Sequence, residues 1–156
     1  MTTHVLVAED DAEMRAAIVR SLADDGMSVE EARSGGEALA KLGDGGVDLF
    51  VTDVMMPDLG GVQAAAMARS AGAHLPILVM TARRDEWIVE SVRKLQFADL
   101  LYKPFSAEEL LERARALLAR RDSSSLLPPA PDSERHVFPP ALVPLLRGLV
   151  GDAPVL

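Results

Sequence analysis

Short apolar runs alternate with longer amphipathic segments along residues 1–121 of this chain. The runs are typical of buried strands, and the segments between them carry apolar residues at helical spacing. In the first such segment, for example, Met14, Ile18 and Leu22 recur every four residues. The pattern predicts five strands and five helices in alternation. The strands are expected at Val5–Ala8, Ser28–Ala32, Leu49–Thr52, Ile77–Thr81 and Leu100–Tyr102.

Capping residues and glycines mark the expected helix boundaries. The stretches Ser34–Glu37 and Ser106–Glu109 are capping boxes, in which Ser and Glu satisfy free backbone amides of a first helical turn. Gly26 is expected to end the first helix. The helices are expected over Ala12–Asp25, Ser34 to about Leu42, an Ala-rich stretch ending near Gly72, Glu86–Leu95, and Ser106 to Arg121.

The strands are continuous apolar runs, which is typical of a parallel sheet covered on both faces. The sequence therefore predicts an α/β fold with a doubly wound, five-stranded parallel sheet of (βα)5 type over residues 1–121. Residues 122–136 are rich in Ser and Pro and predict a linker. Residues 137–156 predict a short amphipathic C-terminal segment, with apolar residues at Phe138, Leu142, Leu145, Leu146 and Leu149.

Composition and charge narrow the class of protein. The net charge of −8 repels nucleic acid and anionic membranes, so direct contact with either is not expected. The absence of cysteine excludes disulfides and thiolate metal sites. The chain shows neither a transmembrane run nor the basic start of a signal peptide, so we expect a cytoplasmic protein. Residues 122–156 are too few for a typical DNA-binding output domain.

Polar side chains follow four of the expected strands at the point where each strand ends. Glu9 and Asp10 follow the first strand, and Asp53 follows the third. Thr81 ends the fourth strand and Lys103 follows the fifth. The carboxyl ends of parallel strands form one edge of a sheet, and ligands bind there in open α/β folds. Carboxylates, a hydroxyl and an amine at one edge are suited to binding Mg²⁺ and a phosphoryl group.

Each of these residues also has a purely structural interpretation. The acidic residues after the first strand could simply cap a helix, and Asp11 is the one best suited to that role. Asp53 could be a turn residue, Thr81 a structural threonine and Lys103 a solvated surface lysine. The functional interpretation is favoured because all of them coincide at one sheet edge.

Four stretches of the sequence resemble the receiver domain of two-component response regulators, of the single-domain chemotaxis type. The similarity covers about residues 4–121 and implies a flavodoxin-like receiver fold. In this family the peptide bond that corresponds to Lys103–Pro104 is often cis, so the resemblance implies a cis bond here. The matching stretches are Val5–Asp11, Val51–Pro57, Val79–Arg83 and Tyr102–Phe105.

The resemblance implies a role for each strand-end residue. Asp53 would be the phosphoacceptor, Thr81 would hydrogen-bond the phosphoryl oxygens, and Lys103 would pair with the phosphoryl charge. An Asp carboxylate is a recognised nucleophile for such covalent transfer. The cofactor would be Mg²⁺, held by Glu9, Asp10, Asp53 and the main-chain carbonyl of Met55.

The resemblance also implies partners. A sensor histidine kinase or a histidine phosphotransfer protein would supply the phosphoryl group, and a downstream protein target would receive the signal by contact. A homodimer through the fourth helix, fifth strand and fifth helix is a further expectation. The chain would not be an enzyme beyond catalysing its own phosphorylation and dephosphorylation.

Several positions depart from the pattern of the family. Leu100 stands where the family often has an aromatic residue, whereas Tyr102 is expected on the same face of the strand as Leu100. Gln96 and Phe97 replace the usual Gly-Ala pair, and Gly60 stands where an acid is common. These departures concern the usual conformational switch rather than the phosphoryl chemistry.

Two other functions are compatible with the sequence. A degenerate receiver would act as a constitutive interaction module, although the complete acidic set argues against this. A phosphohydrolase that forms an aspartyl phosphate commonly has a second acid two residues after its nucleophile. That position is Met55 in this chain.

Overall fold

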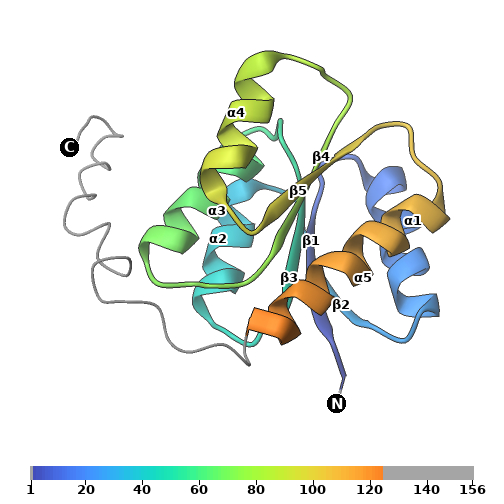
Figure 1. Ribbon diagram of the computed structural model, residues 1–156. Coiled ribbons are helices and arrows are strands. Elements are labelled where there is room, and N and C mark those ends of the chain that lie inside the picture. The colour runs from blue at the N-terminus through green and yellow to red at the C-terminus, as the bar shows by residue number, and fades with distance from the viewer. Residues whose placement is uncertain (1, 125–156) are drawn as a thin grey trace. The chain divides into compact units, whose positions relative to one another are not determined.

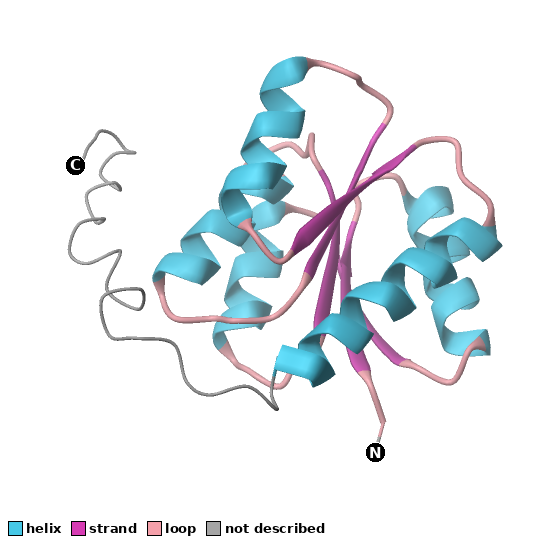
Figure 2. Ribbon diagram, in the orientation of Figure 1, coloured by secondary structure: helices cyan, strands magenta, loops and turns pink. Residues whose placement is uncertain are grey.

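The computed structural model describes residues 2–124 and confirms the predicted (βα)5 alternation (Figures 1 and 2). Five strands alternate with five helices along this part of the chain. The strands are β1 (His4–Ala8), β2 (Ser28–Ala32), β3 (Leu49–Asp53), β4 (Ile77–Thr81) and β5 (Ala98–Tyr102). The helices are α1 (Ala12–Asp24), α2 (Gly35–Gly43), α3 (Gly61–Ser70), α4 (Glu86–Leu95) and α5 (Ala107–Ser124).

All five strands are parallel and lie in the order β2-β1-β3-β4-β5. Helices α1 and α5 cover one face of the sheet, and α2, α3 and α4 cover the other (Figure 1). The direction of winding reverses between β1 and β3, which are hydrogen-bonded neighbours. Such a reversal opens a crevice beyond the carboxyl ends of the two strands, where α/β folds bind ligands.

Two apolar clusters fill the space between the sheet and its helices. Because successive strand side chains point to opposite faces, Leu6 packs toward α2, α3 and α4, whereas Val5 and Val7 pack toward α1 and α5. The central strands are buried on both faces, as a parallel sheet requires. The sheet is therefore a rigid support for the loops at its carboxyl edge.

The observed boundaries differ from the expected ones mainly at the C-terminal end. Strand β5 begins at Ala98, two residues before the expected start. Helix α5 continues through Asp122–Ser124, because this stretch contains neither Pro nor Gly. The rest of the expected linker and the amphipathic segment 137–156 lie outside the described residues. None of the helices within residues 2–124 has both the length and the hydropathy to cross a bilayer.

The predicted helix caps are present. Asp11 caps α1, because its carboxylate accepts hydrogen bonds from the backbone N–H groups of Glu13 and Met14. At α5, Ser106 Oγ accepts from the Glu109 amide, and Glu109 Oε1 accepts from the Ser106 amide. These bonds fix where each loop of the carboxyl edge enters its helix.

Candidate functional site

Three carboxylates meet at the carboxyl edge of the sheet. Glu9 and Asp10 follow β1, and Asp53 is the last residue of the adjacent β3. One carboxylate oxygen from each residue lies within 4.8 Å of the other two. Glu9 is buried, Asp53 is half-buried and Asp10 is exposed. Carboxylate oxygens are the ligands that Mg²⁺ prefers, so this donor set fits that ion.

Lys103 lies between two of the three carboxylates. Its Nζ donates to Glu9 Oε1 at 2.9 Å and to Asp53 Oδ2 at 3.3 Å. The Lys103 side chain is 17% exposed and that of Glu9 only 1%, so solvent screens their ion pair weakly. A single ammonium therefore joins the end of β1 to the end of β3.

Burial and charge shift the pKa values of this pair. Burial raises the pKa of the Glu9 carboxyl, the hydrogen bond from Lys103 lowers it, and repulsion by Asp53 raises it, leaving it above its ordinary value. Burial alone would lower the pKa of Lys103, but its bond to Glu9 and the attraction of both carboxylates raise it above the ordinary value. The pKa values of Glu9 and Lys103 are both raised, so each group holds its proton more tightly than it would in water. This is expected where negative charge is concentrated.

The backbone around Asp53 is tightly fixed. Asp53 Oδ1 accepts a hydrogen bond from the Val54 amide at 2.8 Å, which directs the carboxylate back toward its own loop. Gly61, the first residue of α3, lies against the carbonyl of Asp53 and the side chain of Thr52. A Cβ at position 61 would overlap both groups, so glycine is required for α3 to start this close to the end of β3.

Thr81 lies at the end of β4, the next strand after β3 in the sheet. The residue is buried, and its Oγ1 accepts a hydrogen bond from the Arg83 amide at 3.0 Å. Its main-chain carbonyl accepts from the Lys103 amide at 2.8 Å. Thr81 therefore holds the backbone that carries Lys103, whose bond to Pro104 is cis as the resemblance implied.

Met55 and Asp11 are the remaining residues that the sequence singled out. Met55 is in the loop between β3 and α3, and its side chain is exposed. Asp11 is not part of the group of carboxylates that could hold a metal, in agreement with the expectation that it serves as a cap.

Arg15 and Arg84 belong to the surroundings of the site, although no motif identified them. Arg15 Nη1 donates to the main-chain carbonyl of Glu9 at 2.8 Å. The signal available in the sequence was spacing, because a residue one turn after an N-cap points back toward that cap. The Arg84 guanidinium lies 4.1 Å from the centre of the Tyr102 ring, and Tyr102 is the register partner of Thr81.

Gln96 and Phe97, which replace the usual Gly-Ala pair, form the turn before β5. Gln96 and Phe97 both have positive φ angles, of 58° and 48°. The guanidinium of Arg69, from the last turn of α3, donates to four main-chain carbonyls around this turn, those of Leu75, Leu95, Gln96 and Phe97. Burial lowers the pKa of Arg69 from its ordinary value.

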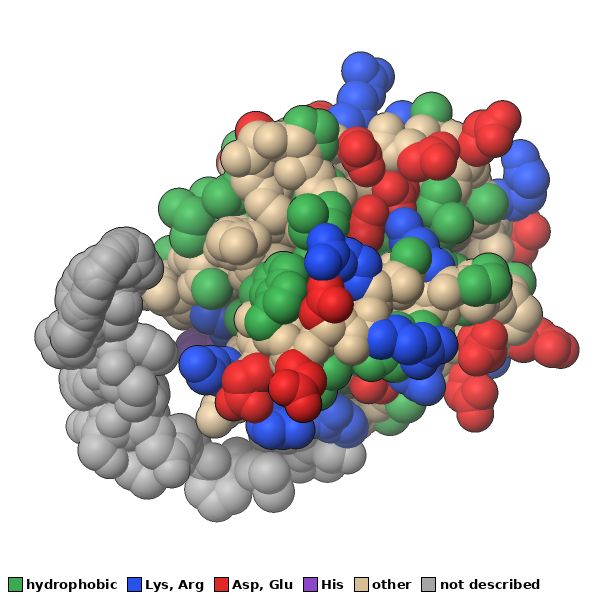
Figure 3. All heavy atoms as spheres, turned by 90° about the horizontal axis from the view of Figure 1, so that it is seen from above, with side chains coloured by type: hydrophobic (Ala, Val, Ile, Leu, Met, Phe, Trp, Pro, Cys, Tyr) green, Lys and Arg blue, Asp and Glu red, His purple; other side chains and the backbone are tan. Residues whose placement is uncertain are grey.

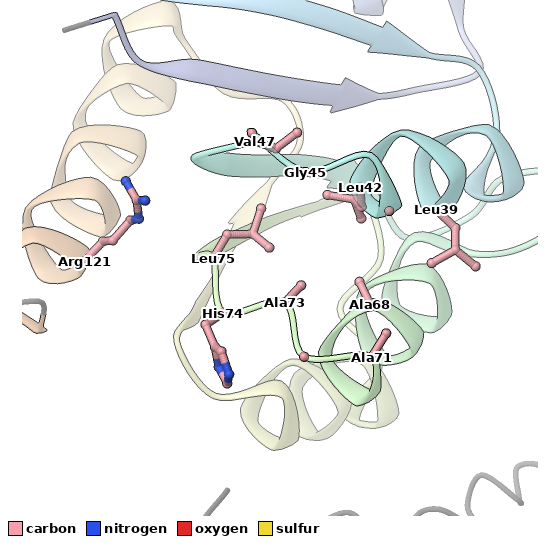
Figure 4. Close-up of a pocket in the computed structure, with 13 residues that line it drawn as sticks. Leu39, Leu42, Gly45, Val47, Ala68, Ala71, Ala73, His74, Leu75 and Arg121 are labelled. Carbon is pink, nitrogen blue, oxygen red and sulfur yellow. The ribbon is translucent and has the colours of Figure 1, made fainter. Parts of the chain in front are cut away.

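A hollow of about 490 Å³ lies at the opposite, amino edge of the sheet (Figure 4). Its walls come from the ends of α2 and α3 and from the segments that precede β3 and β4. Small residues such as Gly45, Ala71 and Gly72 leave this space open. It is lined by none of the strand-end residues, so the acidic cluster and this hollow lie at opposite edges of the sheet.

Comparison with known proteins agrees with this geometry. The family model for the response regulator receiver domain matches residues 5–115. The response regulator MprA of Mycobacterium sp. strain KMS is 45% identical over 140 residues, which is 88% of this chain and 58% of that protein. MprA of Mycobacterium bovis strain BCG / Pasteur 1173P2 is 46% identical over 122 residues, covering 77% of this chain and 52% of that protein. The chain thus spans little more than half the length of these relatives.

Solved structures with the same fold include two receiver proteins. Chemotaxis protein CheY4 of Vibrio cholerae aligns with a TM-score of 0.71 and 28% identity, over 75% of this chain and 99% of that one. The receiver domain of Francisella response regulator 1452 aligns with a TM-score of 0.71 and 30% identity, over 77% of this chain and 99% of that one. The chain therefore belongs to the response regulator receiver domain family, a family of signalling domains in two-component systems.

Proposed function

We propose that this chain accepts a phosphoryl group on Asp53, with Mg²⁺ as cofactor, and signals by contact with other proteins. The observation that carries the proposal is the meeting of three carboxylates and one ammonium at the end of β3. Glu9, Asp10, Asp53 and the carbonyl of Met55 would hold the metal. Bound Mg²⁺ would neutralise charge on the phosphoryl oxygens and let a carboxylate approach them.

In the transfer, an oxygen of the Asp53 carboxylate forms a bond to phosphorus while the bond from phosphorus to the donor breaks. The leaving group, an imidazole from a phosphohistidine or a carboxylate from an acyl phosphate, departs with the electron pair of that bond. Lys103 needs only to exchange a carboxylate partner for a phosphoryl oxygen, because its Nζ already contacts Asp53. Thr81 Oγ1 accepts from the Arg83 amide, so its own proton is available for a phosphoryl oxygen.

The test is intact-mass analysis after treatment with acetyl phosphate, with and without Mg²⁺. We expect one added phosphoryl group on the wild-type chain with Mg²⁺, and none after chelation or in Asp53→Asn. Asp44→Asn is the matched control, because Asp44 is exposed and follows α2 at the other edge of the sheet. A phosphoryl group on Asp53→Asn, or on wild-type protein without metal, would show the assignment to be wrong.

Proposed partners follow from the family. A histidine kinase or histidine phosphotransfer protein would donate the phosphoryl group, and the output would be protein contact rather than DNA binding. Acidic and basic side chains are intermixed on the face seen in Figure 3, and the net charge is −8. Both features favour the recognition of proteins and argue against a broad surface that binds nucleic-acid phosphates. Trp87 on α4 is 46% exposed and could contribute to a homodimer through α4, β5 and α5.

Two measurements separate this function from its alternatives. A degenerate receiver would gain no phosphoryl group and would bind its target equally with and without acetyl phosphate. A phosphohydrolase would turn over a general phosphatase substrate many times per chain. We expect a single, stable modification instead, because Met55 stands where such phosphohydrolases commonly have a second acid, two residues after the nucleophile.

A further inference from the structure

Arg15 forms a bridge beneath the acidic cluster. It lies in the first turns of α1, and its side chain is 12% exposed. Its Nη1 donates to the main-chain carbonyl of Glu9 at 2.8 Å, and its Nε donates to Glu31 Oε1 at 2.9 Å. Glu31 is on β2, so one guanidinium connects the neighbouring strand to the loop that carries two carboxylates.

The carbonyl that Arg15 contacts belongs to the peptide group joining Glu9 to Asp10. Fixing the plane of this peptide fixes the direction in which both side chains leave the strand. The other polar groups of Glu9 are held as well. Its amide donates to the Ala32 carbonyl at 3.1 Å, and Oε2 accepts from the Asp11 amide at 3.2 Å. Without Arg15, the Glu9 carbonyl would lose this donor, and the plane of the Glu9–Asp10 peptide would be less firmly fixed.

Arg15 is also a cation near an anionic cluster, and this effect has the opposite sign. As a charge alone, Arg15 would weaken the binding of a divalent cation, so its removal would tighten binding. Its ion pair with Glu31 offsets much of that charge. A loss of Mg²⁺ affinity in a variant that lacks Arg15 would therefore indicate an orienting role, whereas a gain would indicate an effect of charge alone.

We propose that Arg15 is a positioning residue for Mg²⁺ binding, which fixes the Glu9–Asp10 peptide so that both carboxylates face Asp53. The proposal rests on the proposed function, since it assigns a role within the same site. Residues that orient metal ligands typically contribute about tenfold or more to metal affinity. Arg15 contributes through the backbone rather than by contact with the ion or the phosphoryl group.

The experiment measures Mg²⁺ affinity of the full chain by isothermal titration calorimetry, and acetyl phosphate labelling as a function of Mg²⁺ concentration. We expect Arg15→Met to weaken Mg²⁺ binding about tenfold while the labelling rate at saturating Mg²⁺ stays within about twofold of wild type. The Mg²⁺ affinity of Arg15→Lys should lie between those of wild type and Arg15→Met, because Lys keeps the charge and one donor nitrogen. Arg20→Met, on an exposed position of the same helix, should match wild type.

A second variant keeps the proposal testable if Arg15→Met does not fold. Glu31→Met removes the anchor of the guanidinium and should weaken Mg²⁺ binding in the same direction by a smaller factor. Hydrogen exchange of the Asp10 backbone amide in metal-free protein tests the same role without Mg²⁺. This exchange should be faster in Arg15→Met and Glu31→Met than in Arg20→Met. Tighter or unchanged Mg²⁺ binding in Arg15→Met would overturn the positioning role. If wild-type protein bound no Mg²⁺, the proposed function would fail, and this inference with it.

Discussion

The two halves of the carboxyl edge of the sheet are built in different ways. At the ends of β1 and β3, the carboxylates of Glu9 and Asp53 are joined by Lys103, and the backbone of Glu9 is bonded on both sides. At the ends of β4 and β5, an exposed arginine, Arg84, packs on the ring of Tyr102.

The comparison separates chemistry from signalling. The first half consists of motif residues whose polar groups are satisfied mostly by other motif residues, which fits a site that must keep a fixed geometry. In the second half, Arg84 lies outside the family motifs and is held on the ring of Tyr102 by a cation–π contact. We infer that the ends of β1 and β3 would carry the proposed phosphoryl transfer together with Thr81 and Lys103, and that the contact of Arg84 with Tyr102 would take part in transmitting it.

The largest expected effect comes from removing the cation between the two strands. Lys103→Met leaves the buried carboxylate of Glu9 without its ion-pair partner, which is costly because a buried charge keeps its desolvation penalty. We expect a loss of about 2–3 kcal/mol in the free energy of unfolding without metal, below the full value for a buried pair because Asp53 is partly solvated. Mg²⁺ should restore part of this loss.

Urea unfolding with EDTA and with Mg²⁺ measures this effect. Lys94→Met is the control, because Lys94 is exposed on α4. Equal stability of Lys103→Met and Lys94→Met in EDTA would mean that Lys103 is not needed to hold the two strand ends together.

The second effect is a dependence of stability on pH. The folded-state pKa of Glu9 is raised, so folding favours the protonated carboxyl, and stability is greatest below the unfolded-state pKa. Stability should then fall as pH rises from the ordinary carboxyl range through the raised pKa of Glu9. Glu9→Gln keeps an oxygen that accepts from Lys103 and should lose this part of the pH dependence. Thermal unfolding of both proteins in EDTA across this range measures it, and parallel pH profiles would contradict the prediction.

The third effect concerns the turn before β5. Gln96 has φ 58° and ψ 158°, a region that is essentially restricted to glycine. Gln96→Gly should therefore stabilise the protein by about 1 kcal/mol, through relief of strain offset by a more flexible unfolded chain. Urea unfolding gives the value, and Gln63→Gly in helix α3 should have the opposite sign. A destabilised Gln96→Gly would show that the Gln side chain matters more than its backbone conformation.

The smallest effect concerns signalling through the second half of the edge. A cation–π contact at an exposed arginine contributes about 0.5–1 kcal/mol, so Arg84→Met and Tyr102→Leu should each change the response to phosphorylation by only a few-fold. The measurement is the change in Trp87 fluorescence on adding acetyl phosphate and Mg²⁺. Because both residues act through one contact, the double variant should be no worse than either single one. Additive losses, or no loss, would show that this contact is not the route.

Much of the fold and the acidic half of the site could be predicted from the sequence. Apolar runs of strand length, Ser-x-x-Glu caps and acids at strand ends are local signals, and each depends on only a few neighbouring residues. The assignment of Asp11 as a cap was correct for the same reason, since an N-cap is satisfied by amides two and three residues away.

The contacts of the arginines could not be predicted in this way. Arg15, Arg69 and Arg84 have long side chains, and each finds its partners on a different element of the fold. The start of β5 was also missed, because Ala98 and Asp99 are weak strand formers that are held by pairing with β4.

The sequence by itself determined the class of fold and the residues that meet at the carboxyl edge of the sheet. It could do so because periodicity and strand ends are properties of short stretches, and because parallel strands bring their carboxyl ends together. Only the tertiary structure decided that Lys103 joins Glu9 to Asp53, that Arg15 fixes the Glu9 carbonyl, and that Arg84 meets Tyr102. Those contacts join residues on different elements of the fold, and their geometry follows from how the helices pack on the sheet.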